Sequence, residues 1–242
     1  MNRSIRLFAA ILLWHWLAAA FAQTAATAAA GLTCKPANLG LYKIELTRYV
    51  ESGQYARDFA AAVAPAAAYL AAQANRKGKL AIVLDIDETS LSNWPVIKAD
   101  DFGFIRRGPC DLSRSDMPQG ACGWIEWINQ ARDQPLMPTL QLYRQARKEG
   151  AAVFFITGRP GSLRAATERN LRAAGYHGWS ALIMKTGGYR TESVIAYKSS
   201  ARRSIVKRGY TIVLDMGDQE SDLAGGFAER TFKVPNPFYY IP

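Results

Sequence analysis

The chain has 242 residues, 49% of them hydrophobic, and a formal net charge of +10 at pH 7. This length and apolar content suit one globular domain with a substantial core. The basic residues are scattered, without a basic run, zinc-ligand spacing or RNA-binding motif, so we expect no nucleic-acid partner. The positive charge is compatible with two interpretations that the sequence does not separate: a solvated basic surface, or a surface that attracts anionic ligands.

The N-terminus has the pattern of a signal peptide over residues 1–22. Arg3 and Arg6 precede an apolar stretch, and Ala20-Phe21-Ala22 matches a small-x-small cleavage site. We therefore expect a periplasmic or secreted protein. No later stretch is long and apolar enough to span a bilayer, so we expect no membrane anchor after cleavage.

Composition and periodicity divide the remainder of the chain into three segments. Residues 23–37 are rich in Ala, Thr and Gly, which predicts a flexible terminus of the processed chain. Residues 38–79 carry apolar side chains at helical spacing and a break at Ser52-Gly53, which predicts a helical N-terminal segment. Residues 80–242 form the expected core domain.

Strand and helix signals alternate from residue 80 onward. Strands are expected near residues 80–87, 152–157, 181–184, 211–216 and 230–234, and helices near residues 138–149, 162–174, 199–208 and 219–228. This alternation predicts an α/β fold with a doubly wound, Rossmann-like parallel sheet between helices. The insertion at about residues 90–137 is too long for a simple crossover between strands, so we expect a small cap there.

Two carboxylates stand at the end of the first expected strand. The apolar run Ala81–Leu84 continues into Asp85 and, two residues later, Asp87. Parallel sheets place their chemistry just past the carboxyl ends of their strands. A carboxylate at this position can attack a substrate or hold a cation, whereas a plain acidic loop is the structural alternative.

Three later stretches supply the other groups that phosphoryl transfer requires. Thr157-Gly158 follows an apolar strand and offers a hydroxyl group and a glycine turn. Lys198 precedes a helix-like stretch, and Asp218 and Asp222 follow another strand, four residues apart. Together these residues provide a nucleophilic acid, a hydroxyl donor, a fixed cation and acids for a metal, which suits the positioning of phosphoryl oxygens and the neutralisation of their charge.

The four stretches, in this order, resemble the haloacid dehalogenase (HAD) superfamily. Within it, the chain is most similar to the class B-like acid phosphatases, a group that includes bacterial lipoprotein acid phosphatases, plant acid phosphatases and vegetative storage proteins. Other stretches that carry the resemblance are Asn38-Leu39 through Tyr49, Ser52-Gly53, Tyr197-Lys198-Ser199, Gly209-Tyr210, Gly217-Asp218-Gln219 and Pro235-Asn236-Pro237-Phe238-Tyr239-Tyr240.

The resemblance implies a role for each residue that handles the phosphoryl group. Asp85 would attack phosphorus and form an aspartyl phosphate. Asp87 would protonate the leaving alcohol and later activate water. Lys198 would neutralise the phosphate and Asp85, while the Thr157 hydroxyl and the Gly158 backbone would bind phosphate oxygens.

The resemblance also implies a metal site for Mg²⁺. Asp85 and Asp218 would bind the ion directly, Asp222 would hold a metal-bound water, and Asp87 would offer its backbone carbonyl. Hard oxygen ligands beside a phosphate suit Mg²⁺. Helix-capping acids are the alternative interpretation of Asp218 and Asp222.

Two basic residues remain open on the sequence alone. Lys185 also follows an expected strand, but Tyr197-Lys198-Ser199 matches the family pattern better, so we prefer Lys198. Arg159 is either a phosphate contact or a member of a surface ion pair. Only His177 remains after signal cleavage, which excludes phosphatases that need several histidines.

Three cysteines, Cys34, Cys110 and Cys122, occur in the chain. Export makes a disulfide plausible. Cys110 and Cys122 enclose a short segment rich in Gly, Pro and Ser and are the favoured pair, although Cys34 could pair with either. Cys34 lies too far past the expected cleavage site to be a lipid-anchoring cysteine.

The resemblance predicts an acid phosphatase for small phosphomonoesters, with nucleoside 5′-monophosphates among the candidate substrates. A non-catalytic storage or binding protein on the same scaffold is the alternative; plant relatives of that kind can lack the nucleophilic acid, whereas Asp85 and Asp87 are both present here. A monomer and a homodimer are equally compatible with the sequence. Aromatic residues that could pack the cap or flank a base are Trp94, Phe102, Phe104, Trp124, Trp127, Tyr239 and Tyr240.

Overall fold

The computed structural model of this chain describes residues 38–115, 117–186 and 193–241. The chain divides into residues 1–42 and residues 43–242, and of the first unit only the start of helix α2 (Leu39–Glu51) is described. The expected signal peptide, the 23–37 segment and Cys34 lie outside the described residues. Within the described ranges, none of the helices combines the length and apolar character that a membrane crossing requires.

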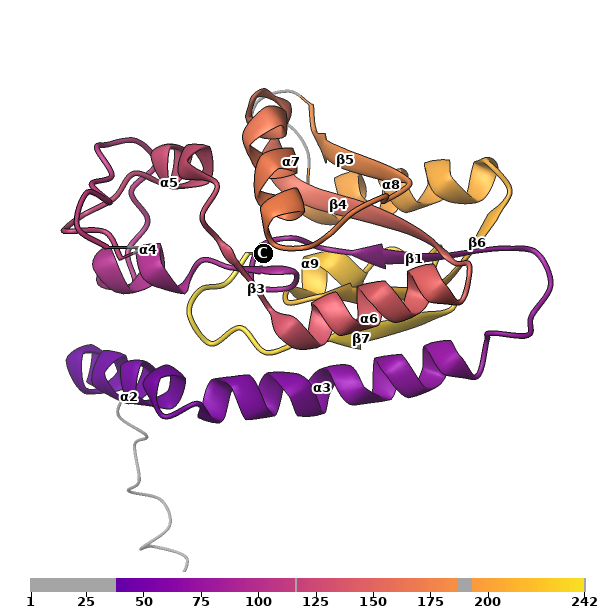
Figure 1. Cartoon of the computed structure of the whole chain (residues 1–242), viewed down its shortest axis with the longest axis horizontal. Coiled ribbons are helices and arrows are strands. Elements are labelled where there is room, and N and C mark those ends of the chain that lie inside the picture. The colour runs from indigo at the N-terminus through magenta and orange to yellow at the C-terminus, as the bar shows by residue number, and fades with distance from the viewer. Residues whose placement is uncertain (1–37, 116, 187–192, 242) are drawn as a thin grey trace, which may run out of the picture. The chain divides into compact units, whose positions relative to one another are not determined.

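A five-stranded parallel sheet forms the centre of the second unit (Figure 1). Its strands are β1 (Lys79–Leu84), β4 (Ala152–Pro160), β5 (Ala181–Lys185), β6 (Tyr210–Gly217) and β7 (Arg230–Lys233). The order β5-β4-β1-β6-β7 places the first strand in the middle, with parallel neighbours on both sides. The doubly wound α/β fold expected from the sequence is confirmed, and each strand lies within a few residues of its predicted range.

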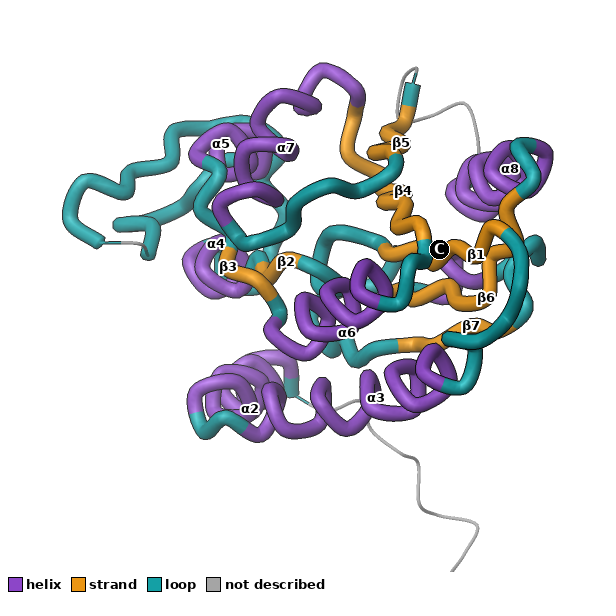
Figure 2. The backbone as a smooth tube through the Cα atoms, turned by 45° about the vertical axis from the view of Figure 1, so that its right-hand side comes forward, coloured by secondary structure: helices purple, strands orange, loops and turns teal. Residues whose placement is uncertain are grey.

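Helices cover both faces of this sheet (Figures 1 and 2). They are α3 (Gln54–Ala71), α6 (Met137–Lys148), the 3₁₀ turn η1 (Gly161–Leu163), α7 (Arg164–Ala173) and α8 (Val194–Lys207). Successive side chains of a strand point to opposite faces. Ile82 and Leu84 of β1 accordingly join the larger core with residues of α3, α6 and α7, while Ala81 and Val83 join the smaller core with α8.

The predicted break in the N-terminal helical segment is present at Gly53. This residue has a φ of 75°, in the left-handed region that glycine adopts without a steric penalty. It separates α2 from α3, and α3 ends at Ala71, earlier than the predicted segment. Tyr55, Phe59 and Val63 then bury one face of α3 in the larger core.

Two helices near the sheet edge differ from the sequence prediction. The helix expected at residues 219–228 is only the short α9 (Glu220–Leu223): Ala224 is already extended, with a ψ of 156°, and Gly225 and Gly226, with φ of 88° and 76°, cannot resume a right-handed helix. Helix α8 begins before the predicted residue 199, so Lys198 lies within the helix and does not precede it.

The insertion between β1 and β4 forms a small cap. It contains α4 (Trp94–Ala99) and α5 (Trp124–Gln130), and its two ends pair as the short antiparallel strands β2 (Leu91–Ser92) and β3 (Gln134–Pro135). A disulfide joins Cys110 to Cys122, the pairing that the sequence favoured. Cys122 packs with Val96 and Trp127 in a separate hydrophobic cluster.

Candidate active site

The carboxyl ends of three adjacent strands carry the predicted site residues. Asp85 directly follows β1, and its backbone N–H donates to the Met216 carbonyl of β6 at 3.0 Å. Thr157 lies in the last part of β4, and Asp218 directly follows β6. Because β4, β1 and β6 are parallel neighbours, these side chains lie at one edge of the sheet.

Three carboxylates and one ammonium group meet at this edge. Oxygen atoms of Asp85, Asp218 and Asp222 all lie within 4.8 Å of one another, and all three residues are buried. Lys198 is buried as well, and its Nζ donates to Asp85 Oδ1 at 2.5 Å and to Asp222 Oδ1. The structure therefore brings together three of the predicted metal-site residues, Asp85, Asp218 and Asp222, of which Asp85 is also the predicted nucleophile, and the predicted cation Lys198.

The charges of this cluster fit a divalent cation. Three buried carboxylates face one buried ammonium group, which leaves two negative charges in excess when all are ionised. Burial raises the pKa of Asp85 well above its usual range; Lys198 opposes this rise, and the Asp222 and Asp218 carboxylates add to it. Burial and the Asp222 carboxylate raise the pKa of Asp218 to about 6. Carboxylate oxygens are ligands for hard divalent ions, so these residues suit such a metal.

Lys198 keeps its positive charge in this setting. Burial lowers the pKa of its ammonium group, but the Asp85 and Asp222 carboxylates outweigh burial and raise the pKa above its usual value. The other candidate, Lys185, is the last residue of β5 and lines the same cavity. The direct contacts of Lys198 with Asp85 and Asp222 make it the better candidate for charge neutralisation at the nucleophile.

Asp218 is held on both carboxylate oxygens. Thr89 Oγ1 donates to Oδ1 at 3.1 Å, while Gln219 Nε2 and Asn236 Nδ2 donate to Oδ2 at 2.6 and 2.7 Å. Sequence reasoning assigned no role to these three partners. Gln219 and Asn236 lie in stretches that carry the family resemblance, and Thr89 follows Asp87 by two residues; this proximity to the motifs is the signal that could have identified them.

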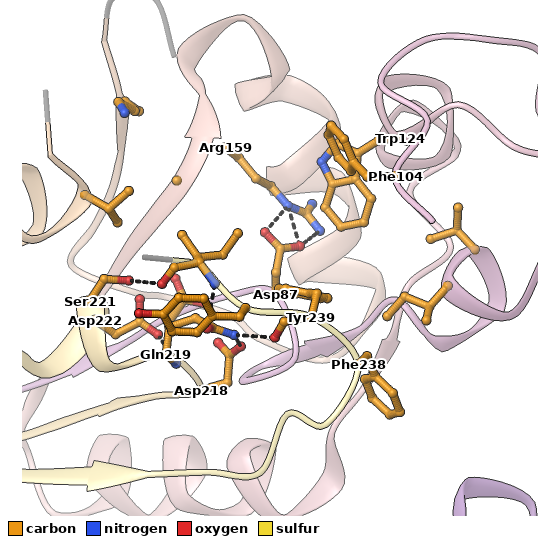
Figure 3. A pocket seen from close by; sticks show the side chains of 18 of the residues that line it. Asp87, Phe104, Trp124, Arg159, Asp218, Gln219, Ser221, Asp222, Phe238 and Tyr239 are labelled. Carbon is orange, nitrogen blue, oxygen red and sulfur yellow. Dashed lines mark hydrogen bonds and ion pairs between the residues drawn. The ribbon is translucent and has the colours of Figure 1, made fainter. Parts of the chain in front are cut away.

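Asp87 lies in a different electrostatic environment from Asp85 (Figure 3). Arg159 Nη2 contacts Asp87 Oδ1 at 2.6 Å and Asp133 Oδ2 at 2.9 Å, and Asn93 Nδ2 donates to Asp87 Oδ1 at 3.0 Å. The Arg159 side chain is only 1% exposed, so of the two alternatives that the sequence left open the surface ion pair is wrong; the pair with Asp133 is buried, while Asp87 is 18% exposed. Arg159 Nη1 has no hydrogen-bond partner within the described part of the chain, and the residue lines the cavity.

The phosphate-binding candidates Thr157 and Gly158 directly precede Arg159 near the end of β4. Thr157 is buried, its Oγ1 accepts from the Arg159 backbone N–H at 3.1 Å, and its carbonyl accepts from Tyr197 Oη at 3.1 Å. Gly158 lines the cavity that contains Asp85 and Asp218. The sequence predicted a glycine turn here, but the structure extends β4 to Pro160, so Gly158 and Arg159 at the end of this strand form part of the wall around the acids.

A cavity of about 390 Å³ opens above the acids. Its wall includes side chains from the cap and from the C-terminal segment, and Figure 3 shows Phe104 and Trp124 side by side near Asp87 and Arg159. Aromatic residues that line it are Phe102, Phe104, Trp124, Tyr197, Phe238, Tyr239 and Tyr240. Phe104 and Tyr240 are about 70% exposed, whereas Trp127 is fully buried and serves packing.

The parallel sheet flanked by helices has the HAD-type fold that the sequence resemblance implies, and the predicted acids follow β1 and β6, with the threonine in β4 and the lysine on α8. The chain matches the model of the HAD superfamily, subfamily IIIB (acid phosphatase) over residues 17–242, and it belongs to this family. It is a HAD-type phosphomonoesterase, a class of enzymes that typically uses a divalent metal and small phosphomonoester substrates.

Two curated relatives support this assignment, and one solved structure supports the fold. The chain is 36% identical to the stem 28 kDa glycoprotein of Glycine max over 82% of this chain and 74% of the relative. It is 32% identical to acid phosphatase 1 of Solanum lycopersicum over 83% of this chain and 69% of the relative. The class C acid phosphatase from Bacillus anthracis shares the fold, with a TM-score of 0.62, 21% identity and coverage of 84% and 86% of the two chains.

Proposed function

We propose that this protein is an exported, Mg²⁺-dependent acid phosphatase that forms an aspartyl phosphate on Asp85. The observation that carries the proposal is the meeting of Asp85, Asp218, Asp222 and Lys198 at one edge of the sheet, inside a cavity. The signal-peptide pattern of residues 1–22 supports export to the periplasm or out of the cell.

The first step is transfer of the phosphoryl group to Asp85. A carboxylate oxygen of Asp85 attacks phosphorus, the bond between phosphorus and the ester oxygen breaks, and Asp87 gives its proton to the leaving oxygen. Lys198 Nζ donates a hydrogen bond to Asp85 Oδ1 at 2.5 Å, and its positive charge balances the negative charge around the phosphoryl group. The Thr157 hydroxyl and the Gly158 backbone bind the non-reacting phosphate oxygens.

The second step releases phosphate. Asp87 takes a proton from a water molecule, this water attacks phosphorus, and the bond between phosphorus and Asp85 breaks. Arg159 and Asn93 orient the Asp87 carboxylate throughout, because three of their nitrogen atoms lie within 3.0 Å of Oδ1.

The metal site would be formed by Asp85, Asp218 and Asp222, with the Asp87 backbone carbonyl as a further ligand. Bound Mg²⁺ would neutralise the negative charge of the phosphoryl oxygens and of the surrounding carboxylates. A divalent cation would cancel the two excess negative charges of the cluster, and this charge balance is the structural reason to expect that the metal is required.

The cavity wall favours aromatic phosphomonoesters, including nucleoside 5′-monophosphates. The exposed ring of Phe104 lies 6.1 Å from that of Trp124, and both line the cavity mouth with Tyr240. Stacking of a base on an aromatic side chain contributes about 1–3 kcal/mol in nucleic-acid grooves. We therefore expect adenosine 5′-phosphate to be a better substrate than glycerol phosphate.

One assay tests this proposal and the storage-protein alternative together. Processed protein is given a panel of phosphomonoesters, with EDTA and after addition of Mg²⁺, and kcat/KM is measured from phosphate release. We expect release that EDTA stops and Mg²⁺ restores. Full activity after exhaustive chelation would disprove the metal site, and no activity on any ester would favour a storage or binding protein.

A further inference from the structure

Two buried cationic side chains of helix α8 contact α9 and the turn that follows it. Lys198 and Arg202 are four residues apart, which places them on one face of the helix. Lys198 contacts Asp85 and Asp222, as described above. Arg202 is 1% exposed and has no place in the proposed chemistry, so its burial requires another explanation.

Arg202 binds the turn that follows α9. Its guanidinium group donates to the carbonyls of Asp222 and Ala224, and its Nε donates to the Gly226 carbonyl at 2.8 Å. The last carbonyls of a helix lack partners within the helix. A helix as short as Glu220–Leu223 is unstable by itself in water. Arg202 supplies the missing donors and closes the end of α9.

Asp215 completes this arrangement from β6. It is 2% exposed, and its Oδ2 lies 2.8 Å from Arg202 Nη1. A buried charge is unfavourable unless it is paired and hydrogen-bonded. Asp215 therefore balances the charge of the guanidinium group as an ion pair, while the backbone carbonyls of the turn accept its hydrogen bonds.

The same turn packs directly against α8. A Cβ atom on Gly225 would lie 2.7 Å from Ser199 Cβ, closer than real Cβ atoms approach, and Ser199 Oγ donates to the Gly225 carbonyl at 2.7 Å. The position of Asp222 depends on this turn, because Asp222 is the residue before the end of α9. Its Oδ2 also accepts from the Gln219 backbone N–H at 2.9 Å, which fixes the other end of the same helix.

We propose that Arg202, held by Asp215, is a positioning residue that fixes α9 so that the Asp222 carboxylate faces Asp85 and Asp218. The proposal rests on the metal site of the proposed function. Residues that orient metal ligands typically contribute about 10–100-fold to metal affinity. The loss of Arg202 is expected to weaken Mg²⁺ binding by such a factor without removing any ligand.

The test compares Mg²⁺ binding by calorimetry among four proteins, all exported and processed in the same way. They are the wild type, Arg202→Met, the double variant Arg202→Met/Asp215→Leu and the control Arg203→Met. The double variant removes both charges of the Arg202–Asp215 pair and leaves neither of them buried alone, so it is expected to fold even where Arg202→Met alone does not. Arg203 is exposed and lies over the Phe227 ring, so its loss removes an arginine of α8 without touching the α9 turn.

We expect wild-type Mg²⁺ affinity for Arg203→Met and a dissociation constant at least about tenfold higher for the double variant, which matches the typical effect of outer partners. The Mg²⁺ concentration for half-maximal activity is expected to rise by the same factor, while kcat at saturating Mg²⁺ falls less. A folded double variant with wild-type Mg²⁺ affinity would overturn the positioning role. Absence of Mg²⁺ binding by the wild type would instead overturn the metal site itself.

Discussion

Replacement of Asp218 by Asn is expected to stabilise the metal-free protein while it abolishes activity. Burial and Asp222 raise the pKa of Asp218 from its usual 3.8 to about 6. A pKa difference of about two units corresponds to about 3 kcal/mol, since each unit is worth about 1.4 kcal/mol. This free energy is the amount by which the ionised Asp218 carboxylate opposes folding in the absence of a cation.

The raised pKa of Asp218 determines in which direction the stability of the metal-free protein changes with pH. A carboxyl group with a higher pKa in the folded state holds its proton more tightly when folded, so stability falls as the pH rises from the unfolded pKa to the folded one. The metal-free wild type is expected to lose stability between about pH 4 and pH 6 from this residue. The asparagine side chain of the variant does not titrate, so the stability advantage of the variant grows over that range and stays constant above it.

Local geometry allows the substitution. Asn is close in shape to Asp, and its carbonyl can still accept from Gln219 and Asn236, while its amide faces the Thr89 hydroxyl, which can accept as well as donate. For a domain of this size, about 3 kcal/mol corresponds to a rise in melting temperature of roughly 6–12 °C.

Thermal unfolding in EDTA and in Mg²⁺ over about pH 4–8 checks the prediction. Mg²⁺ at about 100 times its dissociation constant should stabilise the wild type by about 2.7 kcal/mol and the variant far less. If Asp218→Asn is less stable than the metal-free wild type throughout, or if Mg²⁺ stabilises both proteins equally, the charge argument for the metal site is refuted.

Three further predictions concern the nucleophile, the disulfide and the cavity wall. Asp85→Asn should lower kcat by at least about 10²-fold with an unchanged circular dichroism spectrum, and retention of a tenth of the activity would remove Asp85 as nucleophile. Cys110→Ala/Cys122→Ala opens a loop with a sequence separation of 12 and should cost about 3 kcal/mol, seen as a lower melting temperature that Cys34→Ala does not share. Phe104→Ala should lower kcat/KM for adenosine 5′-phosphate about 5–100-fold and leave glycerol phosphate unchanged; an equal loss for both esters would show that no base stacks on Phe104.

The sheet and its chemical edge could be predicted from the sequence because both depend on local pattern. Apolar runs identified the strands, and alternation with helices identified a parallel sheet, whose carboxyl ends must share one edge. That rule alone places Asp85 and Asp218 together. The assignment of Lys198 over Lys185 needed the family resemblance, because both lysines end in the same cavity.

The partners of the site residues could not be predicted in this way. Arg159 pairs with Asp133 from the cap, and Asp218 binds Asn236 from the C-terminal segment, so each contact joins residues that are distant in sequence. No periodicity encodes such pairs. The short α9 was different, since the left-handed Gly225 and Gly226 that end it were visible as a Gly-Gly pair in the sequence.

The central claim is that the phosphoryl group passes through Asp85, and trapping of the phosphorylated enzyme tests it most directly. Asp87→Asn protein is mixed with para-nitrophenyl phosphate, whose leaving group needs no proton, quenched in acid and reduced with borohydride, which converts an aspartyl phosphate to homoserine. Peptide mass spectrometry should find homoserine at position 85 and at no other aspartate. Turnover of this ester with an unmodified Asp85, or modification at another residue, would contradict the mechanism.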